Sequence, residues 1–319
     1  MKKNLKTNLI WLAIIAVVYA ILSALIVAGI INAFVAQIIT QIGINLIVAV
    51  GLNLVIGFTG QFSFGSAGFM AIGAYTSAIV TARMAPTWGT IFLSMLIGAI
   101  IAGIVAVIVG YPTLRLNGDY LAIATLGVSE IIRILIMNGG DLTNGAAGLS
   151  GIILFTDWGM TFIFAVVIII LILNFINSPS GRATLSVRED EIASESMGVN
   201  VTRVKVIAFT LGAMVTAIAG SLYAGFIGTV TPKDFTWMKS VDALIIVVLG
   251  GLGSITGTVI AAIILGLLNM FLQDFGAIRM IIYSLVLILV MIFRPGGLLG
   301  TWEFKISRFF NKKENKEAK

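Results

Sequence analysis

The sequence predicts an all-α integral membrane protein with about ten transmembrane helices, and three observations carry this prediction. Of the 319 residues, 59% are hydrophobic and 11% are charged, whereas a soluble protein has about 45–50% apolar and about 25% charged residues. The apolar residues form blocks close to the roughly 20 residues that cross a bilayer as a helix. Glycine, proline and polar residues separate these blocks. Water is therefore excluded as the main solvent of the chain.

Cysteine and histidine are both absent from the sequence. Their absence excludes disulfides, thiolate nucleophiles, Cys/His metal sites and histidine acid–base catalysis. The pattern Gly-x-x-x-x-Gly-Lys-Ser/Thr does not occur either, so the chain has no P-loop of its own for nucleotide phosphates. We therefore expect no catalytic residue, no bound metal and no bound cofactor in this chain.

The net charge of +6 is informative through its distribution. Basic residues gather before the first apolar block, in one central polar loop and in the tail: Lys2, Lys3 and Lys6; Arg182, Arg188, Arg203 and Lys205; Lys305, Arg308, Lys312, Lys313, Lys316 and Lys319. The positive-inside rule places such segments in the cytoplasm, and juxtamembrane lysines favour anionic lipid over nucleic acid. We expect one transmembrane domain over 1–319, with cytoplasmic termini, a cytoplasmic loop at 178–205 and a basic tail at 302–319.

The spans follow from counting crossings. The uncharged run Asn8–Ile31 is expected to be a retained first span, because the apolar core of a cleaved signal has only about 7–15 residues. Further blocks follow at 34–56, 62–82, 89–110, 120–138, 160–177 and 206–228. These seven crossings leave 229–240 outside, so a cytoplasmic tail needs an odd number of crossings after it. We expect three, at 241–250, 255–273 and 278–293, with a re-entrant loop over 241–273 as the alternative.

Glycine is abundant, with 35 residues, and it clusters at 57–73 and 250–257. Two interpretations remain open. Small residues allow close packing of helix backbones in membranes, and glycine-rich interruptions can also line a substrate path. Under the second interpretation, Gly60, Gln61 and Ser63 are candidate pathway residues.

Ionisable residues inside apolar blocks are costly and therefore informative. Glu130 and Arg133 are three residues apart, so on a helix they share a face and can form an ion pair. A pathway or gating role for this pair is the alternative. The remaining charges near block ends are expected at interfaces and loop caps: Arg115, Asp119, Asp242, Asp274 and Arg279.

The polar loop at 178–205 is expected to hold one short helix, Val187–Gly198. Ser186 and Glu189 fit a capping box, and Gly198 favours a left-handed C-terminal cap. The helix would be about 16 Å long at about 1.5 Å per residue, and Asn200 can cap the next element. Ile192, Ala193 and Met197 would gather on one side of this helix. An isolated helix this short is marginal in water, so it needs a surface to dock against.

The sequence strongly resembles the LivM-type inner-membrane permeases of branched-chain amino acid ABC importers. The resemblance runs in order along nearly the whole chain, through the segments 51–75, 114–133, 144–152, 181–209, 249–262 and 293–300. The segment GRATLSVREDEIASESMGVNVTRVKVIAF carries it most clearly. It implies a fold like that of type II ABC importer permeases, in a bacterial plasma membrane.

The resemblance also implies partners and one site. A second permease, two ATPase subunits that bind ATP and Mg²⁺, and an extracytoplasmic solute-binding protein would complete the transporter. A cytoplasmic coupling helix would dock on the ATPase; the residues expected there are Val187, Arg188, Glu189, Asp190, Glu191, Ile192, Ala193, Glu195, Met197 and Gly198. The common Glu-Ala-Ala pattern of such helices is absent, because Ser196 and Met197 follow Glu195. The role of any single side chain is therefore less specific than that of the helix and of Gly198.

The expected function is ATP-driven import of leucine, isoleucine and valine, in which this chain is a permease subunit and not an enzyme. Three alternatives stay open. The same machine could carry urea or short amides, or a sugar or nucleoside, because the cargo is chosen mainly by the binding protein. The chain could also be an ion-coupled carrier. A membrane enzyme ranks last, because no nucleophile–base or metal-ligand cluster is visible.

Overall fold

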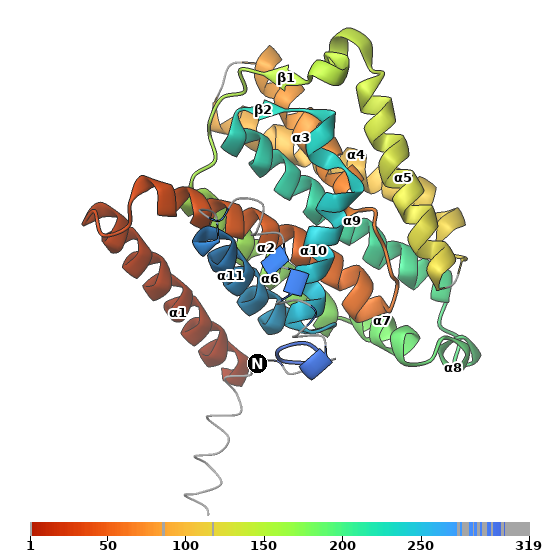
Figure 1. The fold of residues 1–319 in the computed structure, drawn as a ribbon. Helices are drawn as coiled ribbons and strands as arrows, with labels where there is room; N and C mark the ends of the chain where they lie inside the picture. Colours follow the sequence, from red (N-terminus) through yellow and green to blue (C-terminus); the bar gives the residue numbers. More distant parts are fainter. Residues whose placement is uncertain are drawn as a thin grey trace, which may run out of the picture.

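The computed structural model describes residues 2–84, 87–116, 118–272, 275, 281–282, 284–285, 288, 292–294, 296–300 and 303. The elements in this part of the chain are mostly long helices (Figure 1). They are α1 (Lys2–Val27), α2 (Ala33–Thr59), α3 (Ser66–Arg83), α4 (Trp88–Thr113), α5 (Asp119–Met137), η1 (Gly140–Leu142), η2 (Gly145–Ala147), β1 (Leu149–Ser150), α6 (Trp158–Asn177), α7 (Pro179–Glu189), α8 (Glu191–Ser196), α9 (Val201–Ile227), β2 (Thr229–Val230), η3 (Pro232–Phe235), α10 (Trp237–Gly250) and α11 (Ile255–Phe271).

The helices confirm the all-α architecture and the positions of the apolar blocks, but they do not confirm about ten spans. In the described residues, five helices are long and apolar enough to cross a bilayer: α2, α4, α5, α6 and α9. The bent pair of α10 and α11 gives a sixth candidate if it counts as one span. The last expected span, at 278–293, is described only in part, and Asp274, Arg279 and most of the basic tail lie outside the described residues.

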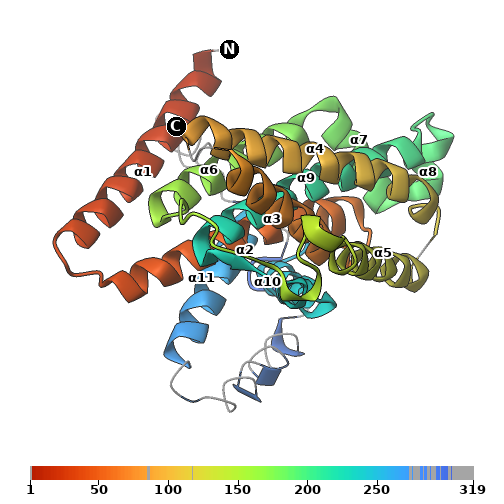
Figure 2. The ribbon, with the colours of Figure 1, turned by 90° about the horizontal axis from the view of Figure 1, so that it is seen from above.

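Helix α9 is the centre of the bundle and packs against α2, α3 and α4. The helices approach closely where a glycine of one helix faces the backbone of the other. A Cβ atom built on Gly73 of α3 would lie 1.8 Å from the carbonyl oxygen of Ala217, and one on Gly220 of α9 would lie 2.0 Å from that of Met70. Seen from above, α4 lies beside α9 and α3 (Figure 2). The first interpretation of the glycines, close helix packing, therefore applies at this crossing.

Helix α1 stands apart from the bundle (Figures 1 and 2). Its contact is with α6, where the ring of Tyr19 stacks on Trp158 at 5.1 Å between centroids and tilts against Phe162 at 5.7 Å. Aromatic pairs at these separations add to the stability that apolar burial alone gives.

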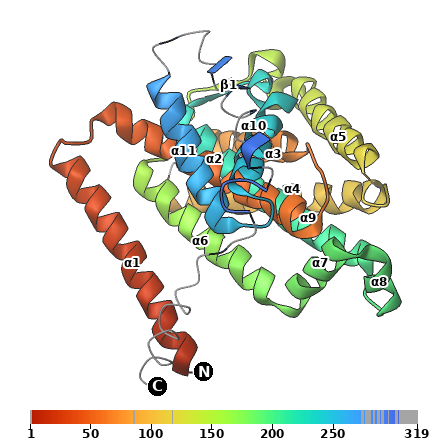
Figure 3. The same ribbon diagram turned by 60° about the horizontal axis from the view of Figure 1, so that its bottom comes forward.

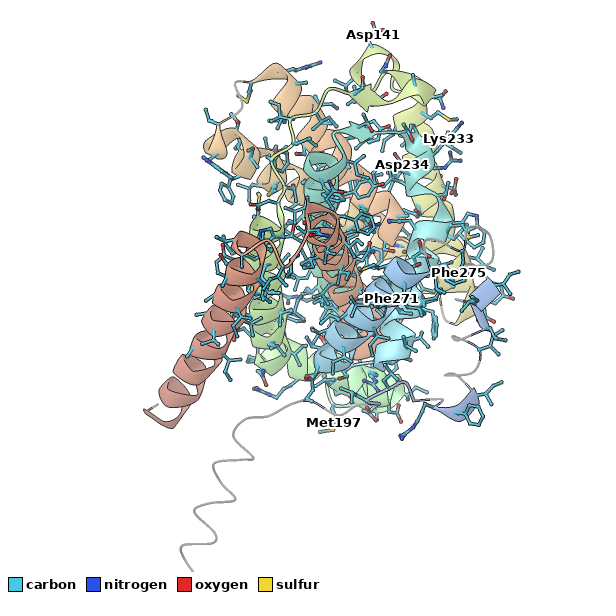
Figure 4. All side chains as sticks on the ribbon, turned by 60° about the vertical axis from the view of Figure 1, so that its left-hand side comes forward. Asp141, Met197, Lys233, Asp234, Phe271 and Phe275 are labelled. Carbon is cyan, nitrogen blue, oxygen red and sulfur yellow. The ribbon has the colours of Figure 1, made fainter. Side chains whose placement is uncertain are left out.

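Two ends of the molecule are distinguished by their structure. At one end, β1 and β2 form an antiparallel pair in which Leu149 faces Val230 and Ser150 faces Thr229. At the other end, α7 and α8 project beyond α6 and α9 (Figure 3). Asp141, Lys233 and Asp234 lie at the first end and Met197 lies at the second (Figure 4).

Candidate functional site: a polar elbow against two helix breaks

The polar loop forms two helices, so the prediction of one helix over Val187–Gly198 is wrong. Helix α7 begins far earlier, because Ser178 caps it by accepting a hydrogen bond from the Gly181 amide at 3.2 Å and Pro179 occupies the first turn. Proline fits this position, since its missing N–H would have no helical partner there. Ser186 lies inside α7 and donates to the Ala183 carbonyl, so the expected capping box with Glu189 does not form.

Helix α8 begins at a different cap and ends as expected. Asp190 accepts a hydrogen bond from the Ala193 amide at 2.9 Å and caps α8. Gly198 has a φ of +85°, and its amide bonds the Glu195 carbonyl, while the Val199 amide bonds the Ser194 carbonyl. This is a complete Schellman motif, which favours glycine at the left-handed position. The prediction that Asn200 caps the next helix is also confirmed, by its bond from the Arg203 amide at 2.9 Å.

The free surface of α8 is apolar at two side chains. Ile192 is 80% exposed and Met197 is 85% exposed. Ala193 and Glu195 are also exposed, whereas Ser194 faces inward. Figure 4 shows Met197 at the extreme end of the molecule. The three apolar side chains expected to gather on one side of the helix are thus all exposed, and described residues of this chain do not cover Ile192 or Met197.

An ion pair holds α8 against α9. The Lys205 ammonium donates to Glu191 Oε2 at 2.7 Å. The Lys205 side chain is 7% exposed and the Glu191 side chain is 45% exposed. A buried charge whose partner is removed destabilises a protein strongly, so Glu191 and the short helix that carries it are fixed to the bundle at this point.

A second link connects α7 to the membrane helices. The Arg188 guanidinium donates through Nη1 to the Gly57 carbonyl at 2.6 Å. Gly57 belongs to the last turn of α2, where Gly60 adopts a φ of +73° and the amides of Gly60 and Gln61 bond the carbonyls of Ile56 and Val55. The Gly57 carbonyl therefore does not receive the Gln61 amide, as it would in a regular helix, and it accepts from Arg188 instead. A cation is favourable here because the C-terminal end of the α2 dipole is negative.

The break after α2, at 60–65, contains the other candidate pathway residues. Gly60 is exposed and lies beside Arg188, whereas Gln61 and Ser63 are buried. Ser63 accepts a hydrogen bond from the Gly65 amide at 3.2 Å. Neither polar atom of the Gln61 side chain has a hydrogen-bond partner among the described residues. A cavity beside this break, lined in part by Ser63 and Ser66, has a volume of only about 10 Å³, so it is far too small for an amino acid.

A second break, between α10 and α11, packs against the first. The two helices are bent by 119°, so the chain turns back and does not continue as one straight span. A Cβ atom on Gly57 would lie 2.3 Å from the Gly253 amide nitrogen. Asn53 of α2, which is fully buried, joins the two breaks: it donates to the Ser254 carbonyl at 3.0 Å and to Thr258 Oγ1 at 2.7 Å, and it accepts from the Gly253 amide at 2.9 Å.

Residues near the end of the chain complete the second break. The Leu298 amide donates to the Leu249 carbonyl at 2.7 Å, and Thr256 donates to Glu303 Oε2 at 2.7 Å. Sequence reasoning missed these contacts and Asn53. The signal for Asn53 was present, because an amide in the uncharged block of α2 needs a partner when it is buried. Its partner, about 200 residues later, left no local signal.

The charged residues of α5 and α10 take no part in the hydrogen bonds described above. Glu130 and Arg133 form the expected ion pair, with 2.7 Å between Oε2 and Nε, and their side chains are 25% and 22% exposed. Asp242 does not cap a loop, because α10 begins five residues earlier, at Trp237. It is an exposed residue in the middle of that helix.

Comparison with known proteins agrees with this architecture. The family described as "Branched-chain amino acid transport system / permease component" matches residues 34–294. The high-affinity branched-chain amino acid transport permease LivM of Escherichia coli K12 is 37% identical over 278 residues, which cover 76% of this chain and 64% of that protein. LivM of Salmonella typhimurium is 36% identical with the same coverage. LivH of Escherichia coli K12 is 32% identical over 145 residues, 45% of this chain and 46% of LivH.

This chain spans somewhat less than two thirds of the length of the two LivM proteins. No solved structure matches it. The family match covers most of the chain and includes both glycine breaks and the elbow of α7 and α8. The chain therefore belongs to the family of branched-chain amino acid transport permeases, and it is a multi-pass membrane protein.

Proposed function

We propose that this chain is a permease subunit of an ATP-driven importer of leucine, isoleucine and valine. It would act with a second permease, two ATPase subunits and an extracytoplasmic solute-binding protein. The chain itself would bind no cofactor, and ATP and Mg²⁺ would be bound by the ATPases. The membrane would be the bacterial plasma membrane, with the chain termini and the α7–α8 end in the cytoplasm.

The observation that carries this proposal is the elbow of α7 and α8. Ile192 and Met197 offer an apolar surface at its tip, and such a patch rimmed by charge suits a protein partner. Behind the tip, Glu191 is bonded to Lys205 of α9, and Arg188 is bonded to Gly57 at the paired breaks. A force applied to α8 would therefore reach the membrane helices through two short polar links.

The proposed mechanism uses these links. When the ATPases close on ATP, they would move α8, and α8 would carry with it the start of α9 and the C-terminal end of α2. Because Gly57 and Gly253 touch, the α10–α11 break would move with α2. The passage would thereby change from outward-facing to inward-facing.

The test is uptake of radiolabelled leucine by proteoliposomes that contain the complete transporter. Met197→Asp places a charge where the ATPase is proposed to bind, so we expect ATP-driven uptake to fall at least tenfold while the subunits still fold. Leu142→Asp, at an exposed apolar site at the opposite end, is the matched control and should retain uptake. Undiminished uptake with Met197→Asp would refute the coupling role of α8.

The same vesicles separate the alternatives. Uptake by this chain alone, driven by an ion gradient without ATP, would establish a carrier instead. If uptake needs ATP but accepts urea, a sugar or a nucleoside and rejects leucine, the ATP-driven importer would stand and its proposed substrate would be wrong.

A further inference from the structure

A short segment near the end of the chain is bonded to both helices of the second break. We call Gly296–Gly300 together with Glu303 the strap; it lies beyond residue 294, where the family match ends. The amides of Leu298 and Leu299 donate to the carbonyls of the last two residues of α10, at 2.7 and 3.4 Å. Carbonyls in the last turn of a helix have no helical partner, so the strap satisfies two of them in α10.

The strap also caps α11. Glu303 Oε1 accepts a hydrogen bond from the Ile255 amide, and Glu303 Oε2 accepts one from Thr256 Oγ1 at 2.7 Å. Ile255 is the first residue of α11, where amides have no helical partner and the helix dipole favours negative charge. The strap therefore bridges α10 and α11 across their bend of 119°.

The two attachments of the strap differ in kind. The attachment to α10 is made by backbone: a Cβ atom on Gly297 would lie 2.6 Å from Gly251 Cα and 2.7 Å from the Val248 carbonyl oxygen. Gly297 is buried and has a φ of +83°, which favours glycine. The attachment to α11 is made by the side chain of Glu303, which is only partly buried. Water can therefore replace the hydrogen bonds of Glu303 more readily than the buried backbone contacts of the strap.

The turn between α10 and α11 is also held by α2 and α7. Asn53 of α2, which is fully buried, donates to the Ser254 carbonyl at 3.0 Å and accepts from the Gly253 amide at 2.9 Å. The Arg188 guanidinium of α7 lies against the same turn, because a Cβ atom on Gly253 would lie 2.4 Å from its Nη1. Two charged side chains from distant segments, Arg188 and Glu303, thus contact this turn and the helix that follows it.

We infer that the strap fixes the bend between α10 and α11, and that Glu303 detaches from α11 whenever this bend changes during transport. A segment bonded to both helices resists any change of the angle between them, and the partly buried carboxylate is the attachment that yields first. The change of the bend rests on the proposed function, in which the second break moves with α2. The hold of Glu303 on α11 does not.

Hydrogen exchange tests this hold without any transport. In the complete transporter without ATP, Glu303→Ala removes both acceptor oxygens, so the amides in the first turn of α11 should exchange at least fivefold faster. Asp141→Ala, at an exposed position near the β1–β2 end (Figure 4), is the matched control and should leave their exchange unchanged. Unchanged exchange with Glu303→Ala would overturn the inference, because the carboxylate would then not hold α11.

A reducible crosslink tests the detachment. The chain has no cysteine of its own, so a short bis-thiosulfonate reagent can join Thr256→Cys to Glu303→Cys across the space of the lost carboxylate. Before crosslinking, the double variant should retain at least half of wild-type leucine uptake. Crosslinking should lower uptake at least tenfold, and a reductant should restore it. Each single variant, treated with the same reagent, is the control and should retain uptake.

The outcomes separate the strap from the proposed function. Undiminished uptake with complete crosslinking, or loss of uptake before crosslinking, would make Glu303 a static support and overturn the inference, while the proposed function would stand. If the wild-type transporter imports no leucine, the proposed function is wrong and the rate of crosslinking decides. A rate that falls at least fivefold with ATP bound and trapped would support detachment, and an unchanged rate would overturn it.

Discussion

The crossing of α3 with α9 and the elbow of α7 and α8 use opposite ways of making contact. At the crossing, Gly73 and Gly220 bring one backbone against another, with no room for a Cβ atom. At the elbow, α7 packs on α6 and α2, but α8 is held mainly by its caps and the Glu191–Lys205 ion pair, while Ile192 and Met197 stay exposed. Substitutions at the crossing should therefore affect the folding of the whole bundle, whereas substitutions at the elbow should affect the position of α8 and, through it, transport.

The largest effect is expected at the crossing. Gly220→Ala introduces a Cβ atom 2.0 Å from the Met70 carbonyl oxygen and 3.1 Å from the Ala74 amide nitrogen, and backbone atoms cannot move aside cheaply. Overpacking of this kind costs about 1–3 kcal/mol or more. We expect a lower thermal unfolding midpoint and a lower yield of monodisperse protein in detergent.

Gly127→Ala on α5 is the matched control for that substitution. Nothing lies within 4 Å of a Cβ atom at this position, and alanine favours a helix over glycine by about 0.5–1 kcal/mol. The variant should be as stable as wild type or more stable. Equal destabilisation by the two substitutions would contradict the packing role assigned to the crossing.

The next effect should come from the Lys205–Glu191 ion pair that holds α8 against α9, and its size should differ between the two residues. Glu191→Gln leaves the buried Lys205 ammonium without its carboxylate; the expected cost is about 1–2 kcal/mol, less than the loss at a fully buried pair, because the site of Glu191 is 45% exposed to solvent and the ion pair is screened there. Lys205→Met leaves a carboxylate that is 45% exposed and can be hydrated, so the expected cost is about 1 kcal/mol or less. Chemical denaturation of the two variants in detergent measures the difference. Equal losses would mean that Lys205 is not desolvated.

Arg188 should matter more for transport than for folding. Arg188→Gln removes the donor to the Gly57 carbonyl; a hydrogen bond to a charged group contributes about 1.5–3 kcal/mol, and the partial exposure of Arg188 reduces that figure. We expect leucine uptake per ATP hydrolysed to fall at least fivefold. Arg182→Gln, an exposed arginine on the same helix, is the control. A similar loss with both variants would assign the effect to the charge of the loop.

The smallest effect separates the observed cap from the expected one. Asp190→Ala removes the hydrogen bond to the Ala193 amide and should cost about 1 kcal/mol, as capping losses do. Ser186→Ala removes only a bond to the Ala183 carbonyl within α7 and should be nearly neutral. Hydrogen exchange at the amides of α8 is a local readout. Faster exchange with Ser186→Ala, and not with Asp190→Ala, would restore the original capping prediction.

The limits of prediction from this sequence have a physical pattern. Hydropathy located α2, α4, α5, α6 and α9, because a bilayer span needs a long apolar block whatever surrounds it. It failed in the polar loop, where several serines and one aspartate could each cap a helix and the start at Ser178 depends on packing of α7 against α6 and α2. Spacing also predicted the Glu130–Arg133 pair correctly, since both residues lie on one helix.

Contacts between residues that are far apart in the sequence could not be predicted from it. Asn53 meets Ser254, 201 residues later, and Arg188 meets Gly57, 131 residues earlier. Each side chain was visible as polar or charged in the sequence, but its partner is a backbone carbonyl, and every residue has one. Only the fold determines which carbonyl such a side chain can reach, and the candidate site is built from these contacts.

Site-specific crosslinking from α8 tests the central claim most directly. In a chain without native cysteine, Met197→Cys can carry a photoreactive label in the complete transporter, and Leu142→Cys at the opposite end serves as the reference site. We expect a crosslink from position 197 to the ATPase subunit, changing in yield when ATP is bound and trapped, and none from position 142. Crosslinks from position 197 only to lipid or to this chain itself would contradict the account.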